Sequence, residues 1–253
     1  MTAIYFPWQL VDLPLRRKWA KHQGRLRTGH GGKEPVCLFN DRTVMGSIAM
    51  TSVKVGQART QLEPTEPMSH IVILSASIRD GRMSHRVALH LHRHITSNPA
   101  HTADLIDLAE LDFPLFHERL KFMTAPAPEV VAFAERIRKA EGVIIVSPEY
   151  NASFPASLKN VIDLLTDEWK RKPVALVPVS GGAFGGAQVT LQLLATLWKI
   201  RAWVMTGAMQ VPTVKNAFDE QGVAVEAEAW AKRCDALLAE LEWAMEATRR
   251  MQG

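Results

Sequence analysis

Residues 75–84, with the sequence SASIRDGRMS, combine side chains that bind anions. The segment lies between an apolar run and an amphipathic segment, so it leads into an expected helix whose first N–H groups and dipole favour a phosphate. It contains neither G-K-[ST] nor G-x-G-x-x-G, which argues against a triphosphate loop and a Rossmann loop. Taken alone, a polar loop before a helix capped by Ser84 is an equally good interpretation. The candidate phosphate ligands are hydroxyl, guanidinium and imidazole groups, from Ser77, Arg79, Arg82, Ser84 and His85.

Residues 146–165, VSPEYNASFPASLKNVIDLL, contain the most specific motif of the chain. The run PEYN at 148–151, followed by ASFP and by LKN at 158–160, resembles the NADPH-dependent FMN reductase family. The likeness covers residues 69 to about 240, with SASIRDGRMS in the place of the phosphate loop and SGGAFGGA in the place of the third binding loop. One difference is Ala76, where many relatives carry glycine. Alanine fits there only if its φ is negative.

The resemblance implies a fold, two cofactors and an activity. The fold is a flavodoxin-like three-layer α/β sandwich, with a five-stranded parallel sheet in the order 2-1-3-4-5 and helices on both faces. The cofactors are FMN and NADPH or NADH. The implied enzyme is an oxidoreductase that passes two electrons to a small acceptor (a quinone, azo compound, metal oxyanion or free flavin) by ping-pong hydride transfer. Relatives assemble as homodimers or homotetramers, which we expect here too.

The flavin contacts follow from the same resemblance. In the family, the segment that matches Pro148, Glu149, Tyr150 and Asn151 lies along the isoalloxazine, and a planar ring needs apolar contact on its faces and polar groups at its edge. Without the motif, a half-buried core tyrosine would be an equal interpretation of Tyr150. The glycine-rich loop at 180–187 allows close backbone approach. We expect it to contact the ring through Ser180, Gly181 and Gly182.

Short apolar runs alternate with longer amphipathic segments from Met68 onward. This pattern predicts strands over 70–74, 103–108, 142–146, 173–179 and 202–205. It predicts helices that begin at 84, 128, 154, 184 and about 219 and end near 97, 140, 165, 199 and 248. Alternation of this kind implies a parallel sheet, with ligands bound beyond the carboxyl ends of the strands where the strand order reverses. The loops after the first, third and fourth strands should therefore form the site.

Residues 1–67 differ from the rest in charge and pattern. They carry ten basic and five acidic side chains, so the net charge of +4 divides into +5 for this stretch and −1 for residues 68–253. The stretch lacks sustained periodicity and ends in a proline-flanked segment, which predicts a poorly ordered basic extension. Two alternatives to an unstructured extension are a targeting segment and translation that starts at Met68. The charge therefore does not indicate nucleic-acid binding by the folded part, and no apolar run suits a membrane, so we expect a cytoplasmic protein.

Other candidate chemistry is weaker. The two cysteines, Cys37 and Cys234, are far apart and lack a C-x-x-C spacing, which argues against a disulfide framework or a zinc site. His90 and His94 have the i, i+4 spacing of a metal pair, but the sequence offers no nearby acidic or sulfur partner, so we expect a solvated face and no metal. We nominate no catalytic side chain, because flavin would carry the chemistry.

Two other function classes stay open. A flavodoxin-type carrier would bind FMN and exchange electrons with proteins instead of NAD(P)H, and a binding module would keep the fold without turnover. Such carriers are usually strongly acidic, whereas residues 68–253 have a net charge of −1, which favours the enzyme.

Overall fold

Five parallel strands form one sheet, in a computed structural model that describes residues 69–111 and 113–252. They are β1 (Ser69–Ser75), β2 (His101–Asp107), β3 (Gly142–Pro148), β4 (Pro173–Val179) and β5 (Trp203–Ala208). Their order is β2-β1-β3-β4-β5, which confirms the predicted flavodoxin-like order. The expected basic extension, the alternative start at Met68 and Cys37 lie outside the described residues.

Six α-helices are described with the sheet, and three short 3₁₀ turns connect them. The helices are α1 (Ser84–Thr96), α2 (Pro128–Lys139), α3 (Ala156–Leu164), α4 (Ala187–Lys199), α5 (Val214–Ala217) and α6 (Ala227–Gln252). The turns are η1 (Leu108–Glu110), η2 (Leu120–Phe122) and η3 (Asp167–Trp169). The last predicted helix begins later than expected. Asp219 accepts hydrogen bonds from the backbone N–H groups of Gly222 and Val223, so the chain turns there before α6 starts.

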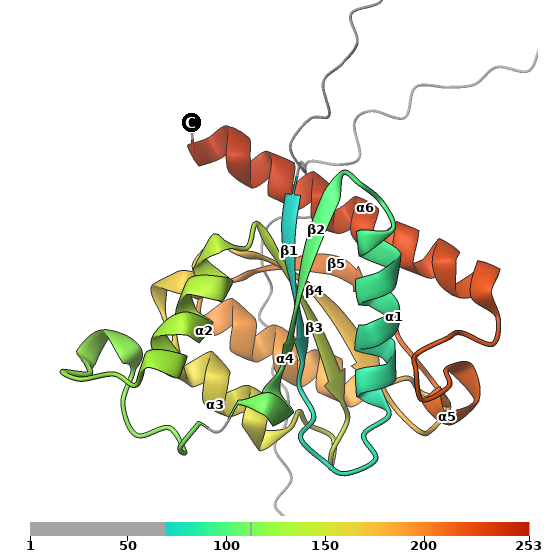
Figure 1. The fold of residues 1–253 in the computed structure, drawn as a ribbon, viewed down its shortest axis with the longest axis horizontal. Coiled ribbons are helices and arrows are strands. Elements are labelled where there is room, and N and C mark those ends of the chain that lie inside the picture. Colours follow the sequence, from blue (N-terminus) through green and yellow to red (C-terminus); the bar gives the residue numbers. More distant parts are fainter. Residues whose placement is uncertain (1–68, 112, 253) are drawn as a thin grey trace, which may run out of the picture. The chain divides into compact units, whose positions relative to one another are not determined.

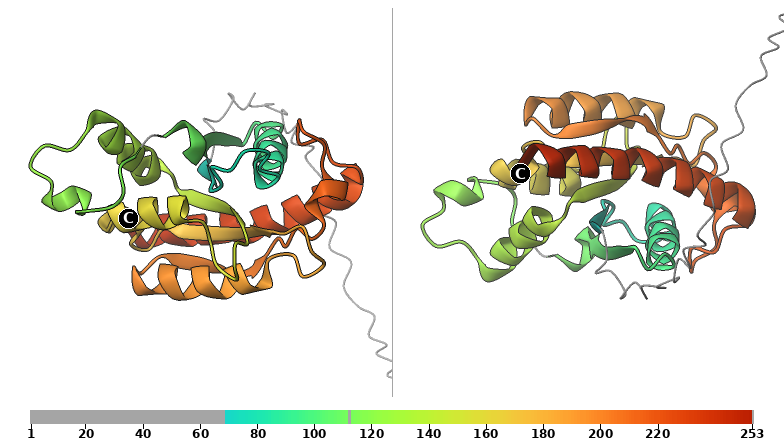
Figure 2. Two further views of the ribbon diagram at one scale, coloured as in Figure 1. Left: turned by 90° about the horizontal axis from the view of Figure 1, so that it is seen from below. Right: turned by 90° about the horizontal axis from the view of Figure 1, so that it is seen from above.

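Two apolar cores lie on opposite faces of the sheet (Figure 1). Helices α1 and α6 cover one face, and α6 contacts β3, β4 and β5 along its length (Figure 2). Helices α2, α3 and α4 cover the other. The predicted apolar stripe of α1 is buried as expected, at Val87, Ala88, Leu91 and Ile95. Strands that are buried on both faces need apolar side chains pointing toward both faces, which explains why their apolar residues follow one another without alternation.

Strand β1 is hydrogen-bonded on both sides, and its register sets the level of the neighbouring loops. Its last residue, Ser75, pairs with Asp107 of β2 and with Val146 of β3. The loop that follows β1 therefore emerges beside the ends of both neighbours. Ala76 continues the pattern by donating its N–H to the carbonyl of Val146 at 3.0 Å, and its φ is negative, so alanine is accommodated there.

Gly186 is the residue that ends the third loop and caps α4. Its φ is +80°, and an added Cβ would lie 2.8 Å from the Cβ of Pro178. Gly186→Ala should therefore lower the free energy of unfolding by about 1–3 kcal/mol, because alanine pays both the left-handed backbone cost and the contact. Urea unfolding of the flavin-free protein measures this. Gly181→Ala is the matched control, since its Cβ would meet no atom within 4 Å, and equal losses in the two variants would contradict the explanation.

Candidate active site

Three loops at the carboxyl ends of β1, β3 and β4 line one cleft of about 250 Å³. Eight of the twelve predicted binding residues line it, namely Arg79, Arg82, Ser84, Pro148, Glu149, Tyr150, Ser180 and Gly181. Val214, at the start of α5, lines it as well. The other four do not line the cleft: Ser77, Asn151 and Gly182 belong to the same loops, and His85 lies in the first turn of α1. The sheet thus brings together segments that are about 70 and 100 residues apart, as the strand order requires.

Ser84 is the first residue of α1 and its hydroxyl is an orphan. The predicted N-cap role is wrong, because Met83 occupies that position and no side chain bonds the helix start. Ser84 is only 2% exposed, and its Oγ has no hydrogen-bond partner in the described part of the chain. A buried polar atom without a partner is costly, so this position suits a ligand that supplies an acceptor.

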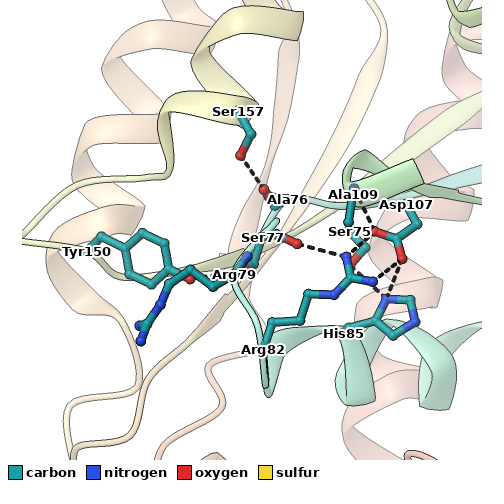
Figure 3. Close-up of polar contacts among 10 residues, drawn as sticks. All are labelled: Ser75, Ala76, Ser77, Arg79, Arg82, His85, Asp107, Ala109, Tyr150 and Ser157. Atoms are coloured by element: carbon teal, nitrogen blue, oxygen red, sulfur yellow. Dashed lines mark hydrogen bonds and ion pairs between the residues drawn. The ribbon is translucent and has the colours of Figure 1, made fainter. Parts of the chain in front are cut away.

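Arg82 and His85 both contact Asp107, a carboxylate that is not among the predicted binding residues. Both terminal nitrogens of Arg82 donate to Asp107, with Nη2 at 2.5 Å from Oδ2, and Nη1 also donates to the carbonyl of Ser77 at 2.9 Å (Figure 3). His85 Nδ1 lies 3.1 Å from Ser75 Oγ and 3.4 Å from Asp107 Oδ2. Arg82 and His85 therefore connect the loop and the start of α1 to the end of β2.

Arg79 and Tyr150 meet on the other side of the predicted phosphate loop, residues 75–84. The Tyr150 hydroxyl lies 2.7 Å from Ser77 Oγ, which is fully buried, and the guanidinium carbon of Arg79 lies 5.4 Å from the centre of the Tyr150 ring. Within the described residues Arg79 makes no ion pair, so its charge is available to an anion. Ser157 Oγ donates to the carbonyl of Ala76 at 2.7 Å and ties α3 to the same loop.

The PEYN segment makes a tight turn. Tyr150 and Ser153 exchange two backbone hydrogen bonds of 2.8 and 2.9 Å, and the two residues between them, Asn151 and Ala152, have φ values of 49° and 63°. This pair of left-handed residues is the type I′ geometry, which asparagine accepts more readily than alanine. The turn presents Tyr150 toward the phosphate loop.

Glu149 links the second and third loops. One carboxylate oxygen accepts from the backbone N–H groups of Gln188 and Val189, at 2.9 and 3.1 Å, and so satisfies two free donors in the first turn of α4. In the third loop, Ser180 Oγ accepts from the N–H of Gly182 at 3.1 Å, and the carbonyl of Ser180 accepts from the N–H of Val214 at 3.2 Å. The three loops are thus joined by hydrogen bonds.

Other regions show no competing chemistry among the described residues. A larger hollow of about 650 Å³ lies between the end of α2, the start of β4 and the end of α6, and it contains none of the predicted binding residues. His94 does have an acidic partner, because its Nε2 lies 2.7 Å from Asp235 of α6, which corrects the expectation of a purely solvated face. No group of three possible metal ligands occurs in the described ranges. None of the helices within them is long and apolar enough to cross a bilayer.

Comparison with known proteins agrees with this arrangement. The family model of NADPH-dependent FMN reductases matches residues 69–237. The chain belongs to that family. A quinone reductase of Escherichia coli is 36% identical over 139 residues, which are 53% of this chain and 72% of the relative. An NAD(P)H-dependent FMN reductase of Saccharomyces cerevisiae is 33% identical over 155 residues, or 55% of this chain and 80% of the relative.

A solved structure extends the comparison to the fold. A flavoenzyme NAD(P)H:(acceptor) oxidoreductase of Paracoccus denitrificans superposes with a TM-score of 0.59 at 22% identity, over 70% of this chain and 98% of its own. As a member of the FMN reductase family, the protein is an NAD(P)H-dependent oxidoreductase that uses FMN.

The residues of the cleft fit FMN on physical grounds. The hydroxyl of Ser84 and the guanidinium of Arg79, neither of which has a hydrogen-bonded or ionic side-chain partner among residues 69–111 and 113–252, suit a phosphate at the start of α1. Tyr150 and Pro148 supply apolar contact, and the backbone around Gly181 is open enough for close approach.

Sequence reasoning missed Asp107 and Val214. Asp107 is the last residue of β2, which pairs with β1 beside the point where strand order reverses, and that position was the one available signal. Val214 reaches the cleft through a turn after β5, for which the sequence offered no motif.

His85 should make stability depend on pH. Burial lowers the pKa of His85 below 6.5, Asp107 opposes this and Arg82 adds to it. The native state then binds fewer protons than the unfolded chain, so the contribution is complete above pH 6.5 and is lost as pH falls through the lowered pKa. His85→Asn should flatten that part of the curve of unfolding free energy against pH.

The control for this prediction is His117→Asn, at an exposed histidine without an ion pair in the described chain. His90, whose pKa burial also lowers, is kept in both variants. An unchanged slope in His85→Asn would show that its protonation is not linked to folding.

Proposed function

We propose that this protein transfers two electrons from NAD(P)H, through bound FMN, to a small acceptor: a quinone, an azo compound, a metal oxyanion or free flavin. The observation that carries the proposal is the cleft itself, where an unpartnered buried hydroxyl, an unpaired arginine and an aromatic turn meet at the reversal of strand order. The name of the E. coli relative, a quinone reductase, favours a quinone among these acceptors.

Each loop has a separate task in this proposal. Arg79, Ser84 and the first N–H groups of α1 bind the phosphate, while Ser77 and Tyr150 hold each other in place beside it. Residues 148–151 and 180–182 would hold the isoalloxazine. When bound, FMN would supply the redox chemistry, namely two-electron transfer from NAD(P)H to the acceptor in a ping-pong sequence. The role of the protein would be to position the reactants.

The test is an absorbance spectrum after FMN addition and desalting, followed anaerobically by NADPH and then by NADH. We expect the protein to retain flavin and its absorption to bleach with one or both nucleotides, because the family pairs these cofactors. Reoxidation by a quinone, measured with the nucleotide already consumed, checks the ping-pong order.

The other outcomes identify the alternatives. Retained flavin that stays oxidised with both nucleotides would indicate an electron carrier. Absence of flavin after desalting would mean that the loops have been assigned wrongly.

We also propose that residues 1–67 are dispensable for this activity. The match to the family model begins at residue 69, so the family resemblance does not include this stretch. A chain that begins at Met68 should retain its flavin and its NADPH-dependent rate within about twofold, well under the tenfold that 1.4 kcal/mol represents. Stopped-flow flavin reduction on both chains measures this, and failure of the shortened chain to fold would contradict it.

Assembly as a homodimer or homotetramer, and a cytoplasmic location, stay predictions. Helix α4 exposes three large apolar side chains at helical spacing, Leu191, Leu194 and Trp198. An apolar face of this kind is where a second copy would bury surface.

A further inference from the structure

The pair formed by Arg82 and Asp107 lies beside the proposed phosphate loop, residues 75–84, and joins it to the end of β2 (Figure 3). Asp107 is the last residue of β2 and its side chain is 6% exposed, while that of Arg82 is 20% exposed. The carboxylate accepts hydrogen bonds from both terminal nitrogens of Arg82, and it also accepts one from the backbone N–H of Ala109 at 3.0 Å. Arg82 is therefore fixed in one orientation by a bidentate ion pair.

Arg82 closes the loop on itself. Residues 76–83 have no regular secondary structure, and the side chains of Ser157 and Tyr150 hold their beginning, at Ala76 and Ser77. Arg82 holds the end of the loop to its beginning, because Nη1 donates to the carbonyl of Ser77 while the same guanidinium is bound to Asp107. The Arg82–Asp107 ion pair thus connects the end of the loop to the end of β2, at the edge of the sheet, and is called the strut below.

We propose that Asp107 is a positioning residue for the FMN phosphate, which acts by holding Arg82 as this strut. Resting on the function proposed above, the inference assigns direct contact with the phosphate to Arg79 and Ser84, and removes Arg82 from the phosphate ligands. Asp107 neutralises Arg82, so Arg79 supplies the free positive charge of the loop.

The rival explanation makes Arg82 a direct phosphate ligand with which Asp107 competes. The two explanations give opposite results for Asp107→Asn. Loss of the strut should weaken FMN binding, because the loop loses its bidentate anchor. Release of a direct ligand should leave binding unchanged or tighter, because a negative charge near the phosphate has been removed.

The experiment compares dissociation constants for FMN and for riboflavin, which lacks the phosphate, by flavin fluorescence titration of the full chain. We expect Asp107→Asn to raise the FMN constant about tenfold and to leave the riboflavin constant nearly unchanged. Arg82→Lys should behave alike, since an ammonium keeps the charge but cannot span the carboxylate bidentately. The double variant should be no worse than either single one, as expected for residues that act as one unit.

Two further variants serve as references. Arg79→Ala removes a direct ligand, so its loss of FMN affinity should add to that of Asp107→Asn. Asp104→Asn is the matched control. Asp104 also lies on β2 and accepts two hydrogen bonds from one arginine, Arg136, at 2.6 and 2.7 Å. Like Arg82, Arg136 also donates to a backbone carbonyl, that of Leu105. This control should leave the ratio of the two constants unchanged.

The proposal is overturned if Asp107→Asn leaves FMN binding unchanged or tighter, or if riboflavin weakens as much as FMN. If Asp107→Asn does not fold, Arg82→Lys keeps the proposal open to refutation, because it leaves the buried carboxylate with a cationic partner and unchanged FMN binding in that variant would overturn the proposal. Failure of the unaltered protein to bind FMN would contradict the proposed function instead, so the two failures are distinguishable.

Discussion

The parallel pairing of β1 with both β2 and β3 determines where the polar segments of this domain emerge. Ser75, Asp107 and Val146 lie at one level of the sheet, so the loop after β1 leaves between two strand ends. Because helices cover both faces, that edge is where unpaired N–H groups and polar side chains can reach a ligand. The apolar strands thus place a polar site without contributing to it directly.

Hydrogen bonds between loops turn this edge into a defined cleft. Glu149 binds the first turn of α4, Ser157 binds Ala76, and Tyr150 binds Ser77. Each bond joins segments that follow different strands, so the loops restrain one another. A cofactor site gains from such preorganisation, because less conformational entropy is lost when the ligand binds.

Charge is divided between support and binding in the phosphate loop. Arg82 and His85 face the buried carboxylate of Asp107, whereas Arg79 is free of carboxylate partners in the part of the chain that the structure describes. A buried carboxylate needs a partner, so two of the three basic groups, Arg82 and His85 but not Arg79, face Asp107 and not the ligand. This division explains how one short loop contains several basic side chains and yet presents a modest charge to its ligand.

The sequence by itself predicted the strands and the apolar stripe of α1, because apolar periodicity is a local property. The order of the sheet, and with it the loops that form the cleft, followed from the family resemblance that the PEYN motif carries. Tertiary structure decided which polar side chains face the ligand. Ser84 could not be recognised as an uncapped orphan, nor Asp107 as the partner of Arg82, because both facts depend on contacts between segments that are separated in the chain. The type of a residue shows what it can bind, whereas which side chain it contacts is decided only when the strands pair and bring distant segments together.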